Sequence, residues 1–295
     1  MATYAHPEVL VETNWVKENL GKSELVAIYV LQIFPPRIKL VEIDVDTKAY
    51  DAGHIPGAIG FNWQTQLQDQ VRRDIISQEA FEKLVGGAGI SPSDTVVVYG
   101  DNNNWFAAYG FWLFKIYGHK DVRLMNGGRV KWLNEGDKTL TVEVPKTTPV
   151  AYKVTSVNLD LRAFVPQVFE ASKGGKWNLV DVRSPDEFTG KVIAPPGMSE
   201  TAQRGGHIPG AKSIPWSTAV ATDGTFKSAD ELRSIYVEQK GVDSKKDTIA
   251  YCRIGERSSH TWFVLKYLLG LNNVKNYDGS WTEYGNLVAA PIEKG

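Results

Sequence analysis

The chain is poor in cysteine: its 295 residues contain one, Cys252. A single cysteine cannot form an internal disulfide, which excludes a disulfide-stapled secreted scaffold. The sequence also lacks an excess of either charge, since 33 Lys and Arg residues against 34 Asp and Glu residues leave a formal net charge of -1. This balance argues against a general affinity for nucleic acid or for acidic membrane surfaces.

Long hydrophobic runs are missing as well. The longest, FAAYGFWLF at 106–114, is about half the length that a membrane span requires. The first twenty residues carry three glutamates and no apolar core, so we expect no signal peptide there. Together with the scarcity of cysteine, these features favour a reducing, cytoplasmic location.

What the chain does contain is an internal repeat. GHIPGA occurs at 53–58 and again at 206–211, and in both halves an apolar strand opened by Asp-Thr follows at the same offset. Further along, NGGRVKW at 126–132 corresponds to DGSWTEY at 278–284. Several landmarks that recur in one order at nearly one spacing predict a tandem of two related domains.

The segment that joins the two halves, 137–157, alternates polar and apolar residues and contains two prolines. This composition predicts an extended linker on the surface instead of a helix. We place the domain boundary near residue 145, which gives domains of 1–145 and 146–295.

Short apolar runs alternate with helical patterns in each half. In the second half, 179–182 and 247–252 are predicted strands, while 228–241 and 257–270 are predicted helices. Each half is therefore predicted to be an open α/β sandwich, a mostly parallel sheet flanked by helices. Ligands of such sheets bind beyond the carboxyl ends of the strands, which is where Cys252 lies.

The repeat lets one half serve as a control for the other. A residue present in both copies is expected to support the architecture, whereas one confined to a single copy is a candidate for chemistry. We expect the two histidines of GHIPGA to anchor their turns through ring hydrogen bonds. The pairs assigned to the scaffold in this way are His54 and His207, Glu42 and Asp181, and Trp63 and Trp216.

The differences between the halves gather around the cysteine. Where the second half has YCRIGERSS, the first has YGDNNNWFA at 99–107, without a thiol or an arginine. Arg183 corresponds to Asp44 in the first half. The stretch 187–206 is much longer than its counterpart and brings Arg204 next to GHIPGA. Only the second half therefore carries a candidate active site.

The loop after Cys252 has the sequence features of an anion cradle. A tight loop between a strand and a helix directs backbone N–H groups inward, and the helix beginning near Arg257 adds a partial positive charge. With Arg253 and Arg257 beside it, the Cys252 thiol is expected to have a pKa below the ordinary value of about 8.5. A thiolate stabilised in this way would need no base partner.

Other polar residues of the loop receive structural expectations. Glu256 would weaken an anion cradle, so we expect its carboxylate to point outward or to pair with an arginine. His260 is expected to pack within the helix, and Ser258 and Ser259 to donate hydrogen bonds at the helix N-terminus.

Three motifs together resemble the rhodanese family, specifically its two-domain thiosulfate sulfurtransferases: the doubled GHIPGA, DVRSPDEF at 181–188 and CRIGERS at 252–258. The resemblance covers nearly the whole chain. It implies an inactive N-terminal domain and a catalytic C-terminal domain, with no metal or organic cofactor. Cys252 would attack the outer sulfur of thiosulfate, release sulfite, and pass its persulfide sulfur to cyanide or a thiol.

The resemblance also implies roles for individual residues. A cation at the position of Arg253 favours thiosulfate, and the loop backbone stabilises the persulfide. The substrate-binding candidates are Arg253, Arg257, Arg183 and Arg204, and the persulfide-stabilising loop comprises Arg253, Ile254, Gly255, Glu256, Arg257 and Ser258.

Three alternatives stay open at this point. Mercaptopyruvate could be the sulfur donor, or the persulfide could be carried to one protein partner. A cysteine-dependent phosphatase is disfavoured, because the active-site loops of that enzyme family typically have five residues between the cysteine and the arginine. Here four residues separate Cys252 from Arg257. The sequence indicates no oligomeric state.

Overall fold

The computed structural model describes residues 3–20, 37–136, 139–197 and 201–295. The chain divides into two compact units, which are described separately below. The N-terminal unit comprises Glu8–Asn158 and Thr222–Thr225, and the C-terminal unit comprises Met1–Pro7, Leu159–Ala221 and Phe226–Gly295.

The division between the units falls after Asn158 and not near residue 145. The reason is that the connecting segment is tied to the N-terminal unit, for example by the Val150 N–H, which donates to the Gly86 carbonyl at 2.9 Å. Residues 139–157 form no helix, in agreement with the predicted extended linker.

The N-terminal unit is built on a parallel sheet with the strand order β1-β5-β4-β2-β3. Its strands are β1 Leu10–Val11, β2 Ile38–Asp44, β3 Ile59–Asn62, β4 Thr95–Tyr99 and β5 Val122–Met125. Its helices are α1 Thr13–Asn19, α2 Lys48–Ala52, α3 Trp63–Gln66, α4 Gln78–Gly87, α5 Trp105–Ile116 and α6 Gly128–Asn134, with 3-10 turns at Pro7–Val9 and Asn102–Asn104.

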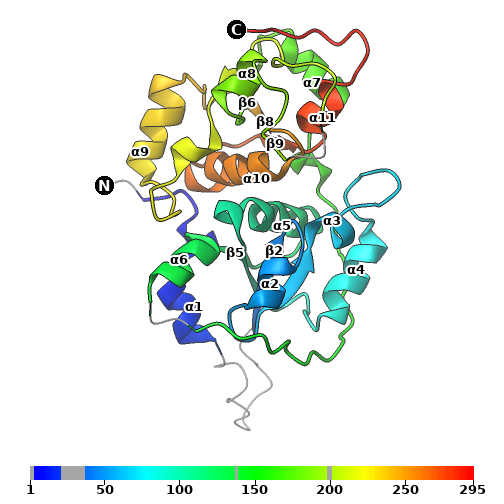
Figure 1. The fold of residues 1–295 in the computed structure, drawn as a ribbon, viewed down its shortest axis with the longest axis vertical. Coiled ribbons are helices and arrows are strands. Elements are labelled where there is room, and N and C mark those ends of the chain that lie inside the picture. The colour runs from blue at the N-terminus through cyan, green and yellow to red at the C-terminus, as the bar shows by residue number, and fades with distance from the viewer. Residues whose placement is uncertain (1–2, 21–36, 137–138, 198–200) are drawn as a thin grey trace. The chain divides into compact units, whose positions relative to one another are not determined.

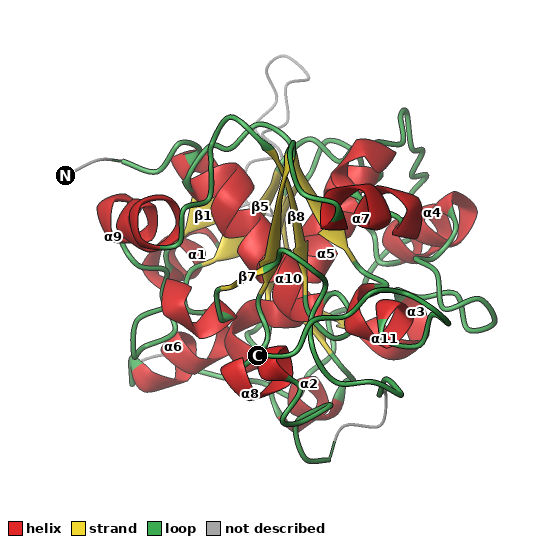
Figure 2. Ribbon diagram, turned by 90° about the horizontal axis from the view of Figure 1, so that it is seen from above, coloured by secondary structure: helices red, strands yellow, loops and turns green. Residues whose placement is uncertain are grey.

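The C-terminal unit repeats this plan with the parallel order β7-β6-β8-β9. Its strands are β6 Trp177–Asp181, β7 Lys212–Ser213, β8 Asp247–Tyr251 and β9 Val274–Tyr277. Its helices are α7 Val165–Ser172, α8 Pro185–Thr189, α9 Ala229–Arg233, α10 Glu256–Phe263 and α11 Ser280–Tyr284, with 3-10 turns at Leu159–Leu161 and Trp216–Ala219. Strands flanked by helices confirm the predicted α/β fold (Figure 1, Figure 2).

Two predicted helices differ in detail from the observed ones. The helix predicted at 228–241 is capped by Ser228 as expected, but α9 passes into a π-helical segment, Ser234–Gln239. In the same way α10 continues as a π-helical segment, Val264–Leu268, because the hydrogen bonds there close one residue later than in an α-helix.

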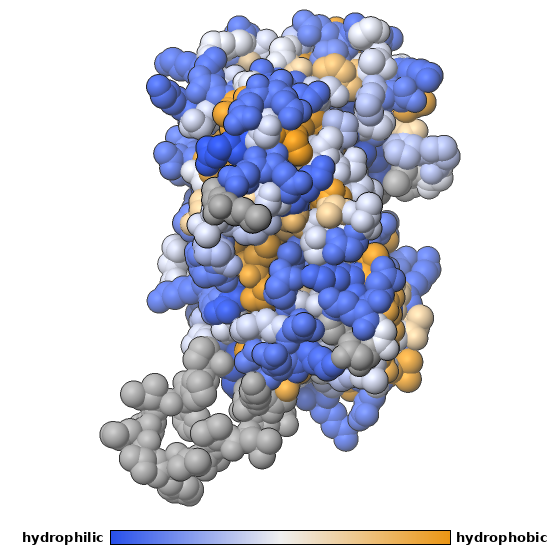
Figure 3. All heavy atoms as spheres, turned by 90° about the vertical axis from the view of Figure 1, so that its left-hand side faces the viewer, coloured by the Kyte–Doolittle hydropathy of each residue, from blue (hydrophilic) through white to orange (hydrophobic). Residues whose placement is uncertain are grey.

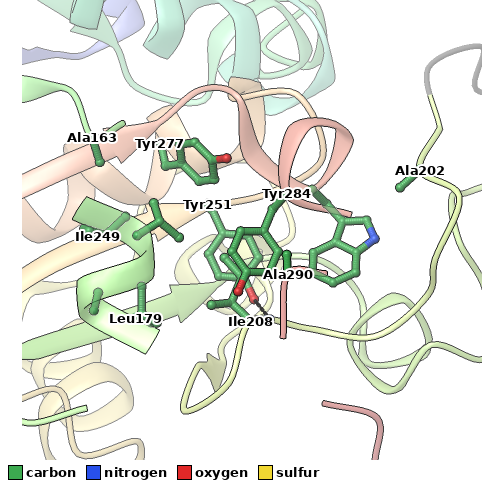
Figure 4. Packing of buried hydrophobic residues seen from close by; sticks show 12 residues of the cluster. Ala163, Leu179, Ala202, Ile208, Ile249, Tyr251, Tyr277, Tyr284 and Ala290 are labelled. Carbon is green, nitrogen blue, oxygen red and sulfur yellow. Dashed lines mark hydrogen bonds between the residues drawn. The ribbon is translucent and has the colours of Figure 1, made fainter. Parts of the chain in front are cut away.

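One face of the C-terminal sheet packs in a hydrophobic core that includes the end of β8, the strand that precedes Cys252. In β8, Ile249 and Tyr251 belong to this core, and alternation along the strand turns Ala250 to the other face. Figure 4 shows Tyr251 beside Ile208, whose backbone N–H donates to the tyrosine hydroxyl at 3.1 Å. The core therefore joins the GHIPGA turn to the strand that ends at the cysteine.

The surface of both units is mostly hydrophilic on the face drawn in Figure 3. Within the described ranges, no helix combines the length and the apolar character needed to cross a membrane.

Candidate active site

Cys252 is the first residue after β8 and lies just before α10, at the carboxyl end of the sheet. Helix α11 holds its backbone on both sides. The Cys252 N–H donates to Ser280 Oγ at 3.0 Å, and the Trp281 N–H donates to the Cys252 carbonyl at 3.0 Å. Thr282 donates twice to the Arg253 carbonyl, from its N–H at 3.0 Å and its hydroxyl at 2.8 Å. The start of the loop is thus fixed from outside the loop.

Gly255 turns the loop back toward the thiol. Its φ of 99° lies in the left-handed region, and a Cβ there would come within 2.8 Å of Asp278 Cα. In this conformation the Gly255 N–H donates to Cys252 Sγ at 3.1 Å. One backbone N–H therefore faces the sulfur, as the predicted cradle requires.

Three side chains donate hydrogen bonds to the carbonyl of Gly255. It accepts hydrogen bonds from Ser258 Oγ at 3.1 Å, Ser259 Oγ at 2.7 Å and Asn276 Nδ2 at 3.3 Å. The two serines thus donate at the helix start as predicted, and together these bonds fix the peptide that aims its N–H at the thiol.

Arg257 is neutralised by a buried carboxylate. Its Nη1 and Nη2 atoms lie 2.9 Å and 3.0 Å from the two carboxylate oxygens of Glu187, which is 0% exposed. Glu187 also accepts from the Ser184 N–H at 3.0 Å in the capping box of α8. Burial by itself would raise the pKa of Glu187, but the hydrogen bonds and charge of Arg257 outweigh it and lower that pKa.

Glu256 does not point outward, so the second of the two expected arrangements applies. Its side chain is buried, and Cys252 Sγ donates to its Oε2 at 3.3 Å. Its other oxygen, Oε1, lies 3.5 Å from Arg257 Nε, so the expected pairing with an arginine is confirmed.

The expectation of a lowered thiol pKa is wrong. Burial raises the pKa of Cys252, and the charge of Glu256 raises it further, while Arg257 acts in the opposite direction. Because Arg257 shares its charge with two carboxylates, it cannot compensate for the loss of water around the sulfur. In this geometry the thiol is protonated near neutral pH.

Arg183 lies in a fully buried network beside the GHIPGA turn. Its Nη2 lies 2.6 Å from Asp181 Oδ2 and donates to the Gly206 carbonyl at 2.7 Å. The guanidinium also stacks over the ring of Trp281 at 4.4 Å. These contacts anchor the turn, and contact of Arg183 with a substrate stays a prediction.

In the first half, an arginine from a different sequence position anchors the GHIPGA turn. Arg129, on α6, pairs with Glu42 at 2.7 Å and donates to the Gly53 carbonyl. The Arg129 and Arg183 guanidinium groups thus both neutralise a buried carboxylate and hold the glycine that opens GHIPGA. The scaffold prediction for the acids Glu42 and Asp181 agrees with these contacts.

Arg204 ties the long 187–206 stretch to the C-terminal segment. Its guanidinium donates to three backbone carbonyls, at 3.2 Å, 3.0 Å and 2.5 Å, those of Gly285, Ala290 and Leu287. Arg204 also lines an open pocket whose other lining residues are Gly190, Ile193, Gln203, Gly205, Ile292 and Lys294. This pocket contains no residue of the cysteine loop, and a role for Arg204 in binding the substrate stays a prediction.

The two GHIPGA histidines anchor their turns as predicted. His54 Nδ1 lies 2.9 Å from the Tyr50 carbonyl oxygen, and His207 Nδ1 lies 2.8 Å from the Phe188 carbonyl oxygen. Each imidazole stacks on the ring of that same residue, at 3.8 Å and 3.6 Å respectively.

The remaining aromatic predictions have mixed outcomes. Trp63 is buried as expected, whereas Trp216 opens a 3-10 turn and is only partly buried. His260 packs between Trp216 and Phe226, as predicted. Burial lowers the pKa of His260 to about 3, so this imidazole is neutral and serves packing.

Several residues of the site were not predicted from the sequence. The Ser-x-x-Glu pattern at 184–187 signals a capping box, but not that its glutamate would hold Arg257. Ser280, Thr282 and Asn276 act through backbone groups of the loop, and no spacing in the sequence indicates such contacts.

The rest of the loop is buried too. Arg253, Ile254 and Ser258 are each less than one-tenth exposed. Among the residues that the structure describes, no group of three or more His, Cys, Asp or Glu side chains could hold a metal ion.

A rhodanese-like domain model matches the chain twice, over residues 14–135 and 165–287. The chain belongs to the rhodanese family. It is 56% identical over 288 residues to a Haloferax volcanii protein named "Putative thiosulfate sulfurtransferase", covering 98% of this chain and 97% of that protein. It is 55% identical to the sulfur carrier protein TtuD of Thermus thermophilus, covering 99% of both chains.

Solved structures of similar fold include an enzyme of ergothioneine biosynthesis. The anaerobic ergothioneine biosynthesis enzyme from Chlorobium limicola, solved with trimethyl histidine, matches with a TM-score of 0.84 and 25% identity. The match covers 100% of this chain and 72% of that enzyme.

Proposed function

We propose that this rhodanese-family protein is a sulfurtransferase that moves the outer sulfur of thiosulfate to a thiophilic acceptor through a persulfide on Cys252. The observation that carries the proposal is the position of the sulfur. Cys252 Sγ lies at the carboxyl end of β8, beside the start of α10, and accepts a hydrogen bond from the Gly255 N–H at 3.1 Å.

The chemistry requires a nucleophilic sulfur and a donor for the charge that develops on it. Cys252 Sγ attacks the outer sulfur of thiosulfate, the S–S bond of the donor breaks, and sulfite leaves with the electron pair. The persulfide then carries negative charge on its outer sulfur. The Gly255 N–H and the positive end of α10 stabilise that charge.

Arg253 and Arg257 supply the cations nearest to the sulfur in the sequence. We infer that Arg253 favours thiosulfate over 3-mercaptopyruvate, because the sulfonate-like end of thiosulfate carries the greater charge. The charge of Arg257 partly counteracts the rise in the pKa of Cys252 that burial and Glu256 cause. We assign Arg183 and Arg204 to holding the turn and the long loop around this site.

A second candidate function is that of a sulfur carrier, in which the persulfide is passed to one protein partner. It is favoured by the similarity to a sulfur carrier protein over 99% of the chain. Burial of Cys252 also favours it, because an enclosed persulfide is protected from unselective thiols.

The test is a measurement of kcat/KM for thiosulfate and for 3-mercaptopyruvate with cyanide as acceptor. Cys252→Ser is expected to abolish transfer from both donors while the circular dichroism spectrum is unchanged. Arg253→Gly is expected to raise the KM for thiosulfate and to shift preference toward 3-mercaptopyruvate. An equal loss for both donors would show that Arg253 does not select between them.

The same assay separates the enzyme from the carrier. Rapid turnover with cyanide supports the enzyme, whereas a persulfide that forms but is discharged only by a protein partner supports the carrier. Release of phosphate from an aryl phosphate that depends on Cys252 would overturn both.

A further inference from the structure

Cys252 has a hydrogen-bond acceptor for its proton within the loop itself. The thiol is fully buried and donates to Glu256 Oε2 at 3.3 Å, an ordinary distance for a bond from sulfur. Since attack on a sulfur donor requires the thiolate, this proton has to leave before or during the reaction. The Glu256 carboxylate is placed to receive it.

We propose that Glu256 is the proton acceptor of Cys252, taking the thiol proton when the persulfide forms and returning it when the sulfur is passed on. This assignment rests on the proposed sulfurtransferase function. It gives the glutamate a catalytic role, because its oxygen touches the reacting sulfur.

The position of Glu256 follows from the architecture that the two halves share. In the first half, Asn104 stands at the start of α5 and its Oδ1 accepts from the Gly100 N–H at 3.0 Å. Gly100 is the first residue after β4, as Cys252 is the first after β8. The residue at this helix start therefore faces the strand end in both units. Only the C-terminal unit has an ionisable pair there.

Arg257 keeps the carboxylate in place. Its Nε lies 3.5 Å from Glu256 Oε1, while its two terminal nitrogens are occupied by Glu187. One oxygen of Glu256 thus lies beside a cation, and the other accepts a hydrogen bond from the thiol. This arrangement suits a proton acceptor, because a carboxylate oxygen within hydrogen-bond reach of the thiol can take its proton.

Two other carboxylates near the loop are paired with arginines. The Asp278 carboxylate is paired with Arg162 at 2.7 Å, and Glu187 is paired with Arg257. Charged groups near the loop therefore include Arg253, Arg257, Glu187, Asp278 and Arg162. Glu256 is the carboxylate that is hydrogen-bonded to the thiol.

The proton balance of the reaction closes with this pair alone. Thiosulfate dianion, the Cys252 thiol and the Glu256 carboxylate become sulfite dianion, the Cys252 persulfide anion and the Glu256 carboxylic acid. The total charge is unchanged, and no two anions are left side by side, because the new O–H can donate to the persulfide. When cyanide takes the sulfur, thiocyanate leaves and the Cys252 thiolate regains the proton from Glu256.

The test is the pH dependence of persulfide formation in a single turnover with thiosulfate, followed by mass spectrometry as the gain of one sulfur atom. In the wild-type protein the proton moves within the pair, so the rate is expected to be constant between about pH 6 and pH 8. In Glu256→Gln the proton must leave to water, so the rate is expected to rise about tenfold for each pH unit below the titration of the thiol. Glu238→Gln, at an exposed glutamate of the same unit, is the matched control and is expected to keep the constant profile.

Each outcome has a defined meaning. A constant profile in Glu256→Gln at the wild-type rate, or a wild-type profile that rises as steeply as that of the variant, would overturn the assignment. If Glu256→Gln does not fold, Glu256→Asp replaces it, and its rate is expected to be lower but still constant with pH. A rise of about tenfold per pH unit in Glu256→Asp would contradict the assignment, because that slope is expected only when the proton acceptor is lost. Failure of the wild-type protein to form any persulfide would instead refute the proposed function.

Discussion

Removing one partner of the buried ion pair between Arg257 and Glu187 is expected to destabilise the C-terminal unit strongly. Glu187→Gln removes one charge without changing the shape of the side chain, and the glutamine oxygen can still accept from the Ser184 N–H. What is lost is the compensation of a guanidinium whose side chain is 6% exposed, at distances of 2.9 Å and 3.0 Å. Breaking such a pair on one side costs about 3–5 kcal/mol, because the remaining charge stays buried.

The loss is reduced here because Glu256 still lies 3.5 Å from Arg257. We therefore expect the lower limit, about 3 kcal/mol, which at a urea slope of about 3 kcal/mol per molar lowers the unfolding midpoint by about 1 M. The pair stabilises the protein above the ordinary pKa of glutamate. That contribution is lost as the pH falls through the lowered pKa of Glu187, so the difference between wild type and variant should shrink in acid.

Urea unfolding followed by circular dichroism measures this difference. The matched control is Glu170→Gln, which breaks a pair with Lys173 between side chains that are 66% and 69% exposed. This change is expected to leave the midpoint nearly where it was. Equal shifts for the two variants, or no shift for Glu187→Gln, would refute the reasoning from burial.

Two further changes test other parts of the structure. Burial and the charge of Asp101 raise the pKa of Asp44 to about 8, so the folded protein binds a proton there more tightly than the unfolded chain. Stability is therefore lost as the pH rises from about 4 toward 8. Asp44→Asn should therefore raise the midpoint of thermal unfolding at about pH 7 but not at about pH 4. An equal gain at both pH values would show that the raised pKa of Asp44 is not the reason. Gly255→Ala should cost about 1–3 kcal/mol and slow sulfur transfer, because φ is 99° and the new Cβ would meet Asp278. Gly174→Ala, at a φ of 82° with open space around it, should cost less and leave transfer unchanged.

The sequence was sufficient for the architecture because the repeat supplied its own control. The roles of His54 and His207 followed from their presence in both halves, and the structure gives both the same ring contacts. The end of β8 before Cys252 and the helix after it were also predictable, since apolar runs and capping residues are local signals.

The comparison of the halves could not reveal a role that two different sequence positions fill. Arg183 is absent from its aligned position in the first half, which suggested chemistry. Arg129, far from that position in the sequence, makes the equivalent contacts to a buried acid and to the glycine of the turn. Comparing residues by alignment cannot detect a contact that two different helices or loops can supply.

The electrostatics of the thiol were not predictable for a related reason. Counting charges along CRIGERS suggested an excess of cations around Cys252. The actual field depends on which carboxylates the fold brings to Arg257, and one of them, Glu187, lies seventy positions earlier in the chain. Burial, the largest cause of the raised pKa of Cys252, is likewise a property of the assembled core.

The hydrogen bonds from α11 to the loop bear on how side chains of this site could be substituted. Residues 280–282 hold the loop through the backbone groups of Cys252 and Arg253. Exchanging the side chains at 253, 254 or 256 would therefore leave these hydrogen bonds to the main chain available. Such a loop can be retuned for another donor or acceptor one residue at a time, with the geometry around the sulfur inherited at each step.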